Sequence, residues 1–221
     1  LLYTGLQTTT AVNGLLLQSM QPALILMLGA LVFGEYVRLP QVIGICLSIT
    51  GALMIILGGD LSSLLELEFN SGDLVICVAV VVCSFYSVLL RKRPAVHPLS
   101  FLAATFVSGI VVIAPFYLAE IIDGRLIESS SESWMAIGYV CLFPSLIAYL
   151  FFNRGVELLG SAATGLYLNI MPVIGAMLAV FILSEPFRWF HLVGMSLIGA
   201  GIFSASRIAR QSVEQSIPAD R

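Results

Sequence analysis

The chain has 221 residues, of which 59% are hydrophobic and 10% are charged, and its formal net charge is −3. A soluble domain carries about 25% charged residues, so this composition excludes a protein whose whole surface faces water. Basic residues cluster only at Arg91-Lys92-Arg93, which is too small a patch to bind nucleic acid. We therefore expect a polytopic α-helical membrane protein whose main partner is the lipid bilayer.

Apolar runs follow one another along the whole chain. A bilayer core of about 30 Å requires about 20 apolar residues per helix. The runs that meet or approach this length are, in chain order, 11–34, 39–59, 74–90, 99–119, 134–152, 161–184 and 189–206. Residues 1–9 are expected to be the tail of a further span. The predicted fold class is all-α, a transmembrane helical bundle of seven full spans plus a stub of an eighth.

Residues 3–56 and 153–206 match as two copies of one segment, offset by 150 positions without a gap. The copies share residues that chance agreement among Leu and Val does not readily explain. The matching pairs are Gly5 and Gly155, Pro22 and Pro172, Glu35 and Glu185, Arg38 and Arg188, Gly44 and Gly194, and Gly51 and Gly201. An internal repeat in a hydrophobic chain is typical of membrane transporters built from duplicated halves.

The repeat also predicts how the chain is divided. Residues 72–150 precede the second copy and have no counterpart before residue 1. The simplest interpretation is a fragment that lacks two spans and most of a third, and the alternative is a naturally shorter protein. The expected parts are the C-terminal part of a first repeat (1–59), an external acidic loop (60–73), a complete second repeat (74–206) and a cytoplasmic tail (207–221).

The charged loops alternate in sign and predict the orientation. Loop 60–73 carries four acids and no base, loop 91–98 three bases and no acid, and loop 120–134 four acids and one Arg. Basic short loops stay in the cytoplasm, so loop 91–98 and the C-terminal tail are expected inside a plasma (bacterial inner) membrane. Glu35 then lies on the cytoplasmic side and Glu185 on the outer side. The two copies therefore run in opposite directions, as inverted repeats of five spans each.

Two matched stretches carry a family resemblance. They read GLQTTTAVNGLLLQSMQPALILMLGALVFGEYVRLPQVIGICLSITGALMI in the first half and NRGVELLGSAATGLYLNIMPVIGAMLAVFILSEPFRWFHLVGMSLIGAGIF in the second. Both have Pro in the fourth span of the repeat and a Gly/Ser-Glu pair at its end. This pattern resembles the drug/metabolite transporter superfamily, specifically its EamA-type members. The resemblance implies ten spans, cytoplasmic termini and a cavity between the halves, through which members export or exchange amino acids, metabolites or drugs.

Polar residues within the fourth spans are the candidate substrate pathway. Gln18 and Gln21 share one helical face, where carboxamides at membrane depth either face a cavity or hydrogen-bond another helix. Both roles remain open for them. Asn169, three residues before Pro172, is the main pathway candidate, with Tyr167 and Tyr149 as further candidates. Pro22 and Pro172 are expected to kink their helices, because proline removes a backbone donor.

Glu35 with Arg38, and Glu185 with Arg188, lie three residues apart at span ends. They are expected to be helix-end ion pairs, with proton coupling as the alternative. The spans contain no metal-ligand cluster and no catalytic dyad, so we expect no enzyme activity, no cofactor and no metal site.

The sequence therefore predicts a secondary transporter that exports a small organic solute by alternating access. A seven-helix receptor or sensor and a non-transporting membrane assembly protein are the alternatives. Small residues spaced along the last span of each copy predict close helix packing. The same packing between two subunits would give a homodimer, which is a possible partner. They are Gly44, Ser48 and Ala52, then Ser196, Ala200 and Ser204.

Overall fold

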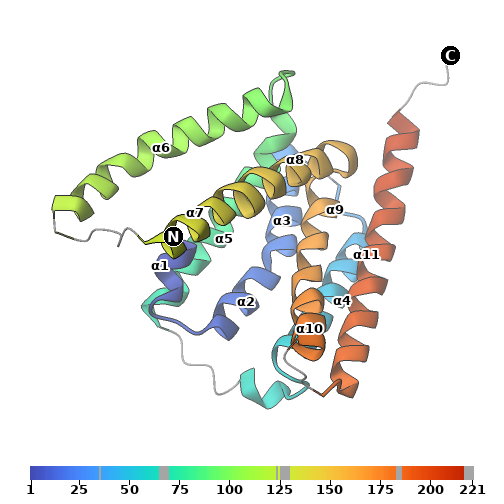
Figure 1. Ribbon diagram of the computed structural model, residues 1–221. Helices are drawn as coiled ribbons and strands as arrows, with labels where there is room; N and C mark the ends of the chain where they lie inside the picture. The colour runs from blue at the N-terminus through green and yellow to red at the C-terminus, as the bar shows by residue number, and fades with distance from the viewer. Residues whose placement is uncertain (35, 65–69, 123, 125–129, 183–185, 217–221) are drawn as a thin grey trace. The chain divides into compact units, whose positions relative to one another are not determined.

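The computed structural model describes residues 1–34, 36–64, 70–122, 124, 130–182 and 186–216, with the backbone alone at 61, 64 and 205–216. The described residues form helices and connecting turns, with no strand among them (Figure 1). The chain divides into two compact units, Leu1–Arg91 with Leu158–Arg221, and Lys92–Glu157. The first unit contains α1 (Leu2–Leu6), α2 (Ala11–Ser19), α3 (Gln21–Phe33), α4 (Leu39–Ile56), η1 (Leu61–Leu64), α5 (Ser71–Leu89), α9 (Ser161–Leu166), η4 (Tyr167–Ile170), α10 (Met171–Ile182) and α11 (Trp189–Ser216).

Six helical segments of the described chain are long and apolar enough to cross a membrane. They are Ala11–Phe33, Leu39–Ile56, Ser71–Lys92, Pro98–Ile122, Ser131–Leu159 and Ser161–Ile182. These segments correspond to six of the seven predicted runs and confirm a polytopic helical membrane protein. The last predicted run, 189–206, corresponds to a shorter apolar stretch, Trp189–Ser204, at the start of α11.

Helices of the first unit begin at positions that differ by 150 residues. The pairs are α2 and α9, which begin at 11 and 161, α3 and α10, at 21 and 171, and α4 and α11, at 39 and 189. The last pair also shares its N-terminal hydrogen bond. The Arg38 N–H donates to Oε1 of Gln41 at 3.0 Å, and the Arg188 N–H donates to Nδ1 of His191 at 3.1 Å. The sequence repeat is therefore repeated in local structure.

Glycines bring α4 and α11 into close antiparallel contact, and the two helices run side by side in Figure 1. A Cβ atom added to Gly51 would lie 2.6 Å from the carbonyl oxygen of Gly194, and one added to Gly194 would lie 2.7 Å from that of Gly51. Gly201 faces the carbonyl oxygen of Gly44 in the same way. Small residues allow helix backbones to approach this closely in membranes. By the 150-residue offset, Gly44 corresponds to Gly194 and Gly51 to Gly201. The contact between Gly44 and Gly201 is therefore equivalent to the contact between Gly194 and Gly51.

The predicted stripe of small residues is divided between two environments. On α4 it is buried inside the chain, at Gly44, Ser48 and Ala52. On α11, Ser196 and Ala200 are exposed, because that helix turns its glycines toward α4. The hydroxyl of Ser204 donates to the carbonyl oxygen of Pro40 at 3.3 Å.

A buried carboxylate, Asp73, holds the corner between α1 and α2 against the start of α5. Asp73 is 2% exposed, and its Oδ1 accepts a hydrogen bond from the hydroxyl of Thr9 at 2.5 Å. Its Oδ2 accepts from Nδ2 of Asn13 at 3.2 Å and from the Asn70 N–H at 2.8 Å. The Asn70 bond is a local helix cap, whereas Thr9 and Asn13 come from a separate part of the chain. This network fixes the point at which α2 begins.

The second unit consists of α6 (Pro98–Ile122) and a continuous helical run of α7 (Ser131–Val140), the π-helical η3 (Cys141–Ile147) and α8 (Ala148–Leu159), whose last two residues belong to the first unit. The 3₁₀ turn η2 (Leu90–Lys92) precedes the unit and ends on its first residue. Pro144 lies within η3, where the wider register accommodates its missing N–H. Glu157 forms ion pairs with Arg93 at 2.6 Å and with Arg154 at 2.7 Å.

Candidate substrate cavity

The first wall of the cavity is the interruption between α2 and α3. The Ser19 hydroxyl donates to the carbonyl oxygen of Leu16 at 2.7 Å, and the Met20 N–H donates to that of Leu17 at 3.2 Å. These bonds tighten the last turn of α2, and α3 begins at Gln21. Pro22 lies in the first turn of α3, where proline is tolerated because the early N–H groups have no partner within the helix. The two helices meet at a bend that is visible in Figure 1.

The second wall is the corresponding interruption between α9 and α10. Residues Tyr167–Ile170 form the 3₁₀ turn η4, and α10 begins at Met171 immediately before Pro172. A Cβ atom on Gly165 would lie 2.7 Å from Cδ1 of Ile25, so α9 approaches α3 as closely as a glycine permits. Both interruptions therefore lie in helices that are in contact.

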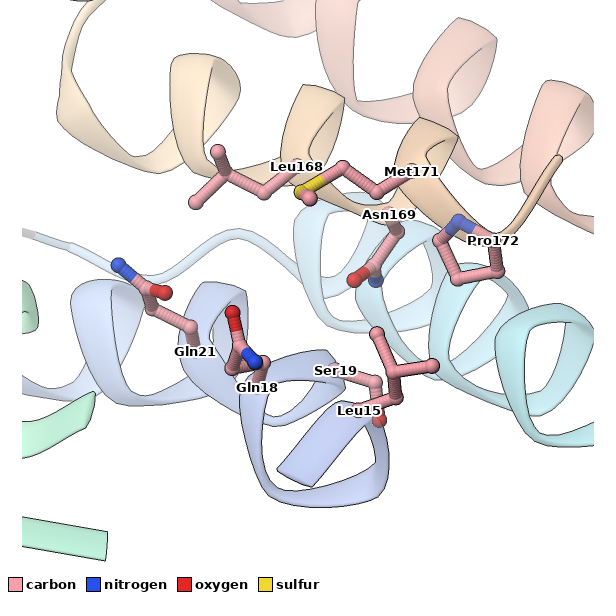
Figure 2. Close-up of a pocket in the computed structure, with 8 residues that line it drawn as sticks. All are labelled: Leu15, Gln18, Ser19, Gln21, Leu168, Asn169, Met171 and Pro172. Carbon is pink, nitrogen blue, oxygen red and sulfur yellow. The ribbon is translucent and has the colours of Figure 1, made fainter. Parts of the chain in front are cut away.

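Asn169 is a buried polar side chain of this region, with 2% of its surface exposed. Its Nδ2 donates to the hydroxyl oxygen of Ser48 on α4 at 3.0 Å, and Ser48 is fully buried. A buried amide without partners is costly, and this bond satisfies one side of the group. Figure 2 shows the Asn169 amide directed toward the space next to α2.

The space between the two interruptions is a small cavity of about 40 Å³. Its lining residues carry no formal charge, and they are Leu15, Gln18, Ser19, Gln21, Leu168, Asn169, Met171 and Pro172 (Figure 2). A water molecule requires roughly 10–15 Å³ by this kind of measure. The cavity thus holds a few waters or a small polar group, and a larger solute would require the walls to move apart.

The predicted pathway residues are not all brought together. Gln18, Gln21 and Asn169 line the cavity, with the two glutamines half-buried. Tyr167 is 40% exposed and lies outside the lining set. Tyr149 belongs to the second unit and forms an edge-to-face contact with Phe106, with ring centroids 6.0 Å apart.

The predicted helix-end ion pairs are only partly described by the structure. Arg38 and Arg188 lie immediately before α4 and α11 and are exposed. Glu35 and Glu185, their predicted partners, lie outside the described residues. Within the described residues, no group of three His, Cys, Asp or Glu side chains is arranged to hold a metal ion.

Sequence reasoning did not list Ser19 or Ser48 among the pathway residues. Ser19 occupies the position of Asn169 in the first copy, and this correspondence was the available signal. Ser48 was assigned to helix packing, and its contact with Asn169 joins residues 121 positions apart. Such a contact depends on how α4 and η4 pack, so local sequence pattern carries no signal for it.

A model of the EamA-like transporter family matches residues 1–57 and 70–207, which is most of the chain. The chain belongs to the EamA-like transporter family. This confirms the resemblance to the drug/metabolite transporter superfamily that the sequence indicated.

Curated relatives of this EamA-family chain are themselves named as transporters. It is 30% identical to the uncharacterized transporter YyaM of Bacillus subtilis (strain 168), over 95% of this chain and 69% of YyaM. It is 29% identical to the uncharacterized transporter YetK of the same strain, over 92% of this chain and 62% of YetK. A relative from Methanothermobacter thermautotrophicus, also named an uncharacterized transporter, is 27% identical, and the match covers 59% of that relative. The chain therefore spans less than two thirds of the length of two of these relatives.

The fold has a counterpart among solved structures. This chain superposes on the chain of a solved crystal structure with a TM-score of 0.75 and 20% sequence identity. The superposition covers 95% of this chain and 71% of the other chain. At this identity the likeness establishes the helical arrangement alone.

Proposed function

We propose that this chain is the larger part of a secondary transporter that exports a small organic metabolite, amino acid or drug by alternating access. The observation that carries the proposal is the cavity between two interrupted helices, which is lined by Gln18, Gln21 and Asn169. Interrupted helices near the middle of a membrane are typical of substrate sites in secondary transporters. Family membership and the names of the relatives support the same general role.

The relation between the two copies supports alternating access. Helices that correspond by the 150-residue offset begin at equivalent positions, and α4 runs antiparallel to α11 with exchanged glycine contacts. We interpret these helices as parts of two inverted five-helix repeats. In inverted repeats each half can adopt the conformation of the other, which produces one state open to each side. The small cavity then corresponds to a state in which the two interrupted helices lie close together.

The loop charges support the orientation that is part of the proposal. Arg91, Lys92, Arg93 and Arg154 are expected on the cytoplasmic side of a plasma membrane, together with the C-terminus. The uncharged cavity lining favours neutral or zwitterionic solutes, because a fixed charge would otherwise be expected opposite an ionic one.

The test is a transport assay in proteoliposomes that contain the full-length protein carrying this sequence. A panel of neutral and zwitterionic solutes is measured for counterflow, and Asn169→Leu is expected to reduce the flux by at least about tenfold, since it removes a buried polar contact of the solute. Gln7→Leu, which replaces an exposed carboxamide at the end of α1, serves as the control and should leave the flux unchanged. Equal flux for the wild type and Asn169→Leu with every transported solute would contradict the proposal for this cavity.

A further inference from the structure

We propose that the cavity recognises a hydrogen-bond donor on its solute, namely the ammonium group of an organic amine, and that Ser48 is the positioning residue behind this preference. The inference rests on the proposed transport function and names the solute class for the same site. It follows from which hydrogen-bonding atoms of the lining side chains are already engaged by the protein.

The amide of Asn169 presents its oxygen to the cavity. Its Nδ2 is engaged by the Ser48 hydroxyl at 3.0 Å, and no described residue donates to its Oδ1. Ser48 lies in the tight interface of α4 and α11, where an added Cβ on Gly201 would meet its backbone. The Ser48 hydroxyl accepts from Nδ2 and so holds the nitrogen of the amide on the side of α4.

Gln18 and Ser19 also use a donor within the protein and keep an unengaged acceptor oxygen. Nε2 of Gln18 donates to the carbonyl oxygen of Gly14 at 3.2 Å, which leaves Oε1 and one N–H of the amide unengaged. The hydroxyl hydrogen of Ser19 is used by the carbonyl oxygen of Leu16 at 2.7 Å, which leaves the lone pairs of Oγ. With Asn169, three lining side chains each give one donor to the protein. The two amides keep one N–H each, but the oxygens of all three side chains keep free lone pairs, so unengaged acceptor sites outnumber unengaged donors. Gln21, which has no partner among the described residues, offers both kinds of atom.

The residues around the cavity do not favour an anionic solute, because they carry no positive charge. Residues 1–34 and 158–182, which include all the lining residues, contain no Asp, Glu, Lys, Arg or His. At the start of α3, the N–H groups of Ala23 and Leu24 both donate to the carbonyl oxygen of Met20, and Pro22 has no N–H. A hydrogen-bond donor is therefore the complementary group, and the ammonium end of a zwitterion supplies one without adding net charge to the solute.

The size of the cavity agrees with recognition of a head group. About 40 Å³ corresponds to roughly three water-sized groups, which accommodates an ammonium with one or two carbons. The remainder of the solute would lie beyond the cavity until the walls separate. An ammonium group offers three N–H donors to the unengaged acceptor atoms of this lining.

The experiment compares three probes of one carbon skeleton: butylammonium, butyltrimethylammonium and butyrate. Each is added at equal concentration and ionic strength to the full-length protein in nanodiscs, and binding is measured from the shift of the thermal unfolding midpoint. Butylammonium is expected to raise the midpoint, and the other two probes are expected to leave it unchanged. Butyltrimethylammonium has the same charge without an N–H, so it separates hydrogen bonding from charge.

Two variants test the role of the named residues. Asn169→Leu is expected to abolish the shift, and Ser48→Ala is expected to weaken butylammonium binding by about fivefold, the factor for one lost hydrogen bond that orients the amide. Ser84→Ala is the matched control for Ser48→Ala, because Ser84 is a fully buried serine on α5 whose hydroxyl donates to Val80. It should bind butylammonium like the wild type.

Several results would overturn the inference: a shift with butyrate or butyltrimethylammonium as large as with butylammonium, no shift with any probe, or equal binding by Ser48→Ala and the wild type. Solid-supported-membrane currents on proteoliposomes measure transport directly, so they separate failure of the amine inference from failure of the proposed transport function. Transport of another solute class without amine binding would remove only the inference. Amine binding without any flux would remove the transport function and leave the recognition site.

Discussion

Replacing Thr9 by valine removes one hydrogen bond from a buried carboxylate and changes little else. Thr9 donates to Oδ1 of Asp73 at 2.5 Å, and Asp73 is 2% exposed. Valine has nearly the shape of threonine without the hydroxyl. No described Lys, Arg or His accompanies the carboxylate, whose hydrogen-bond donors are Thr9, Asn13 and the Asn70 N–H.

The expected cost follows from the nature of this bond. A hydrogen bond to a charged group contributes about 1.5–3 kcal/mol, compared with about 0.5–1.5 kcal/mol for a neutral pair. Because the lost bond also leaves a buried oxygen poorly satisfied, we expect the upper half of the first range. Thr9→Val should therefore lower the free energy of unfolding by about 2–3 kcal/mol. The loss should be localised at the corner between α1 and α2.

Thr8→Val is the matched control, because the neighbouring hydroxyl donates to the neutral carbonyl oxygen of Gly5 at 3.3 Å and Thr8 is exposed. Its expected cost is below about 1 kcal/mol. Both variants are measured by reversible unfolding in mixed micelles, with hydrogen exchange of residues 7–16 as a local readout. Equal losses for Thr8→Val and Thr9→Val would refute the assignment of Asp73 as the group that holds this corner.

Further substitutions test other contacts by thermal or denaturant unfolding of the same preparation. Gly201→Ala directs a methyl group at the carbonyl oxygen of Gly44 and should lower the free energy of unfolding by about 1–3 kcal/mol. Gly199→Ala, on the open side of α11, should be tolerated. Similar losses for the two variants would contradict the observed register of α4 and α11. Thr164→Val should be neutral or stabilising by up to about 1 kcal/mol, because the buried Thr164 hydroxyl has no hydrogen-bond partner in the described part of the chain, and a clear loss would reveal a partner. Glu157→Gln should leave the unfolding midpoint nearly unchanged, since the Glu157 side chain is 36% exposed and solvent screens its ion pairs. A clear drop in the midpoint would show that the pairs are shielded.

Local sequence pattern predicted those features that depend on a short stretch of chain. The apolar runs located six segments of spanning length, and the prolines lie where two helices are interrupted. Proline acts on its own turn, and Pro22 and Pro172 lie in the first turns of the helices that follow these interruptions; their role as kinks stays a prediction. The polar residues beside them, Gln18, Gln21 and Asn169, could be placed in the same way.

Features that depend on pairing between helices could not be predicted in this way. The contact of Asn169 with Ser48 requires the register of α4 against η4, which no local pattern determines. The sequence pattern places Asp73 in the external acidic loop, because four acids occur in residues 60–73. The structure places it in the first turn of α5 and buries it, since Thr9 and Asn13 supply the hydrogen bonds that water would otherwise provide.

The two copies differ chemically where they correspond structurally. The positions that match Asn169 and Ser48 across the 150-residue offset are Ser19 and Ile198, and isoleucine has no atom that accepts a hydrogen bond. At this pair of positions, one half therefore contributes an amide that bonds a second helix through Ser48, while the other contributes Ser19, whose hydroxyl donates to Leu16 of its own helix. Under the proposed alternating access, the two halves would therefore offer a solute different polar groups, so the inward-open and outward-open states would not be chemical mirror images.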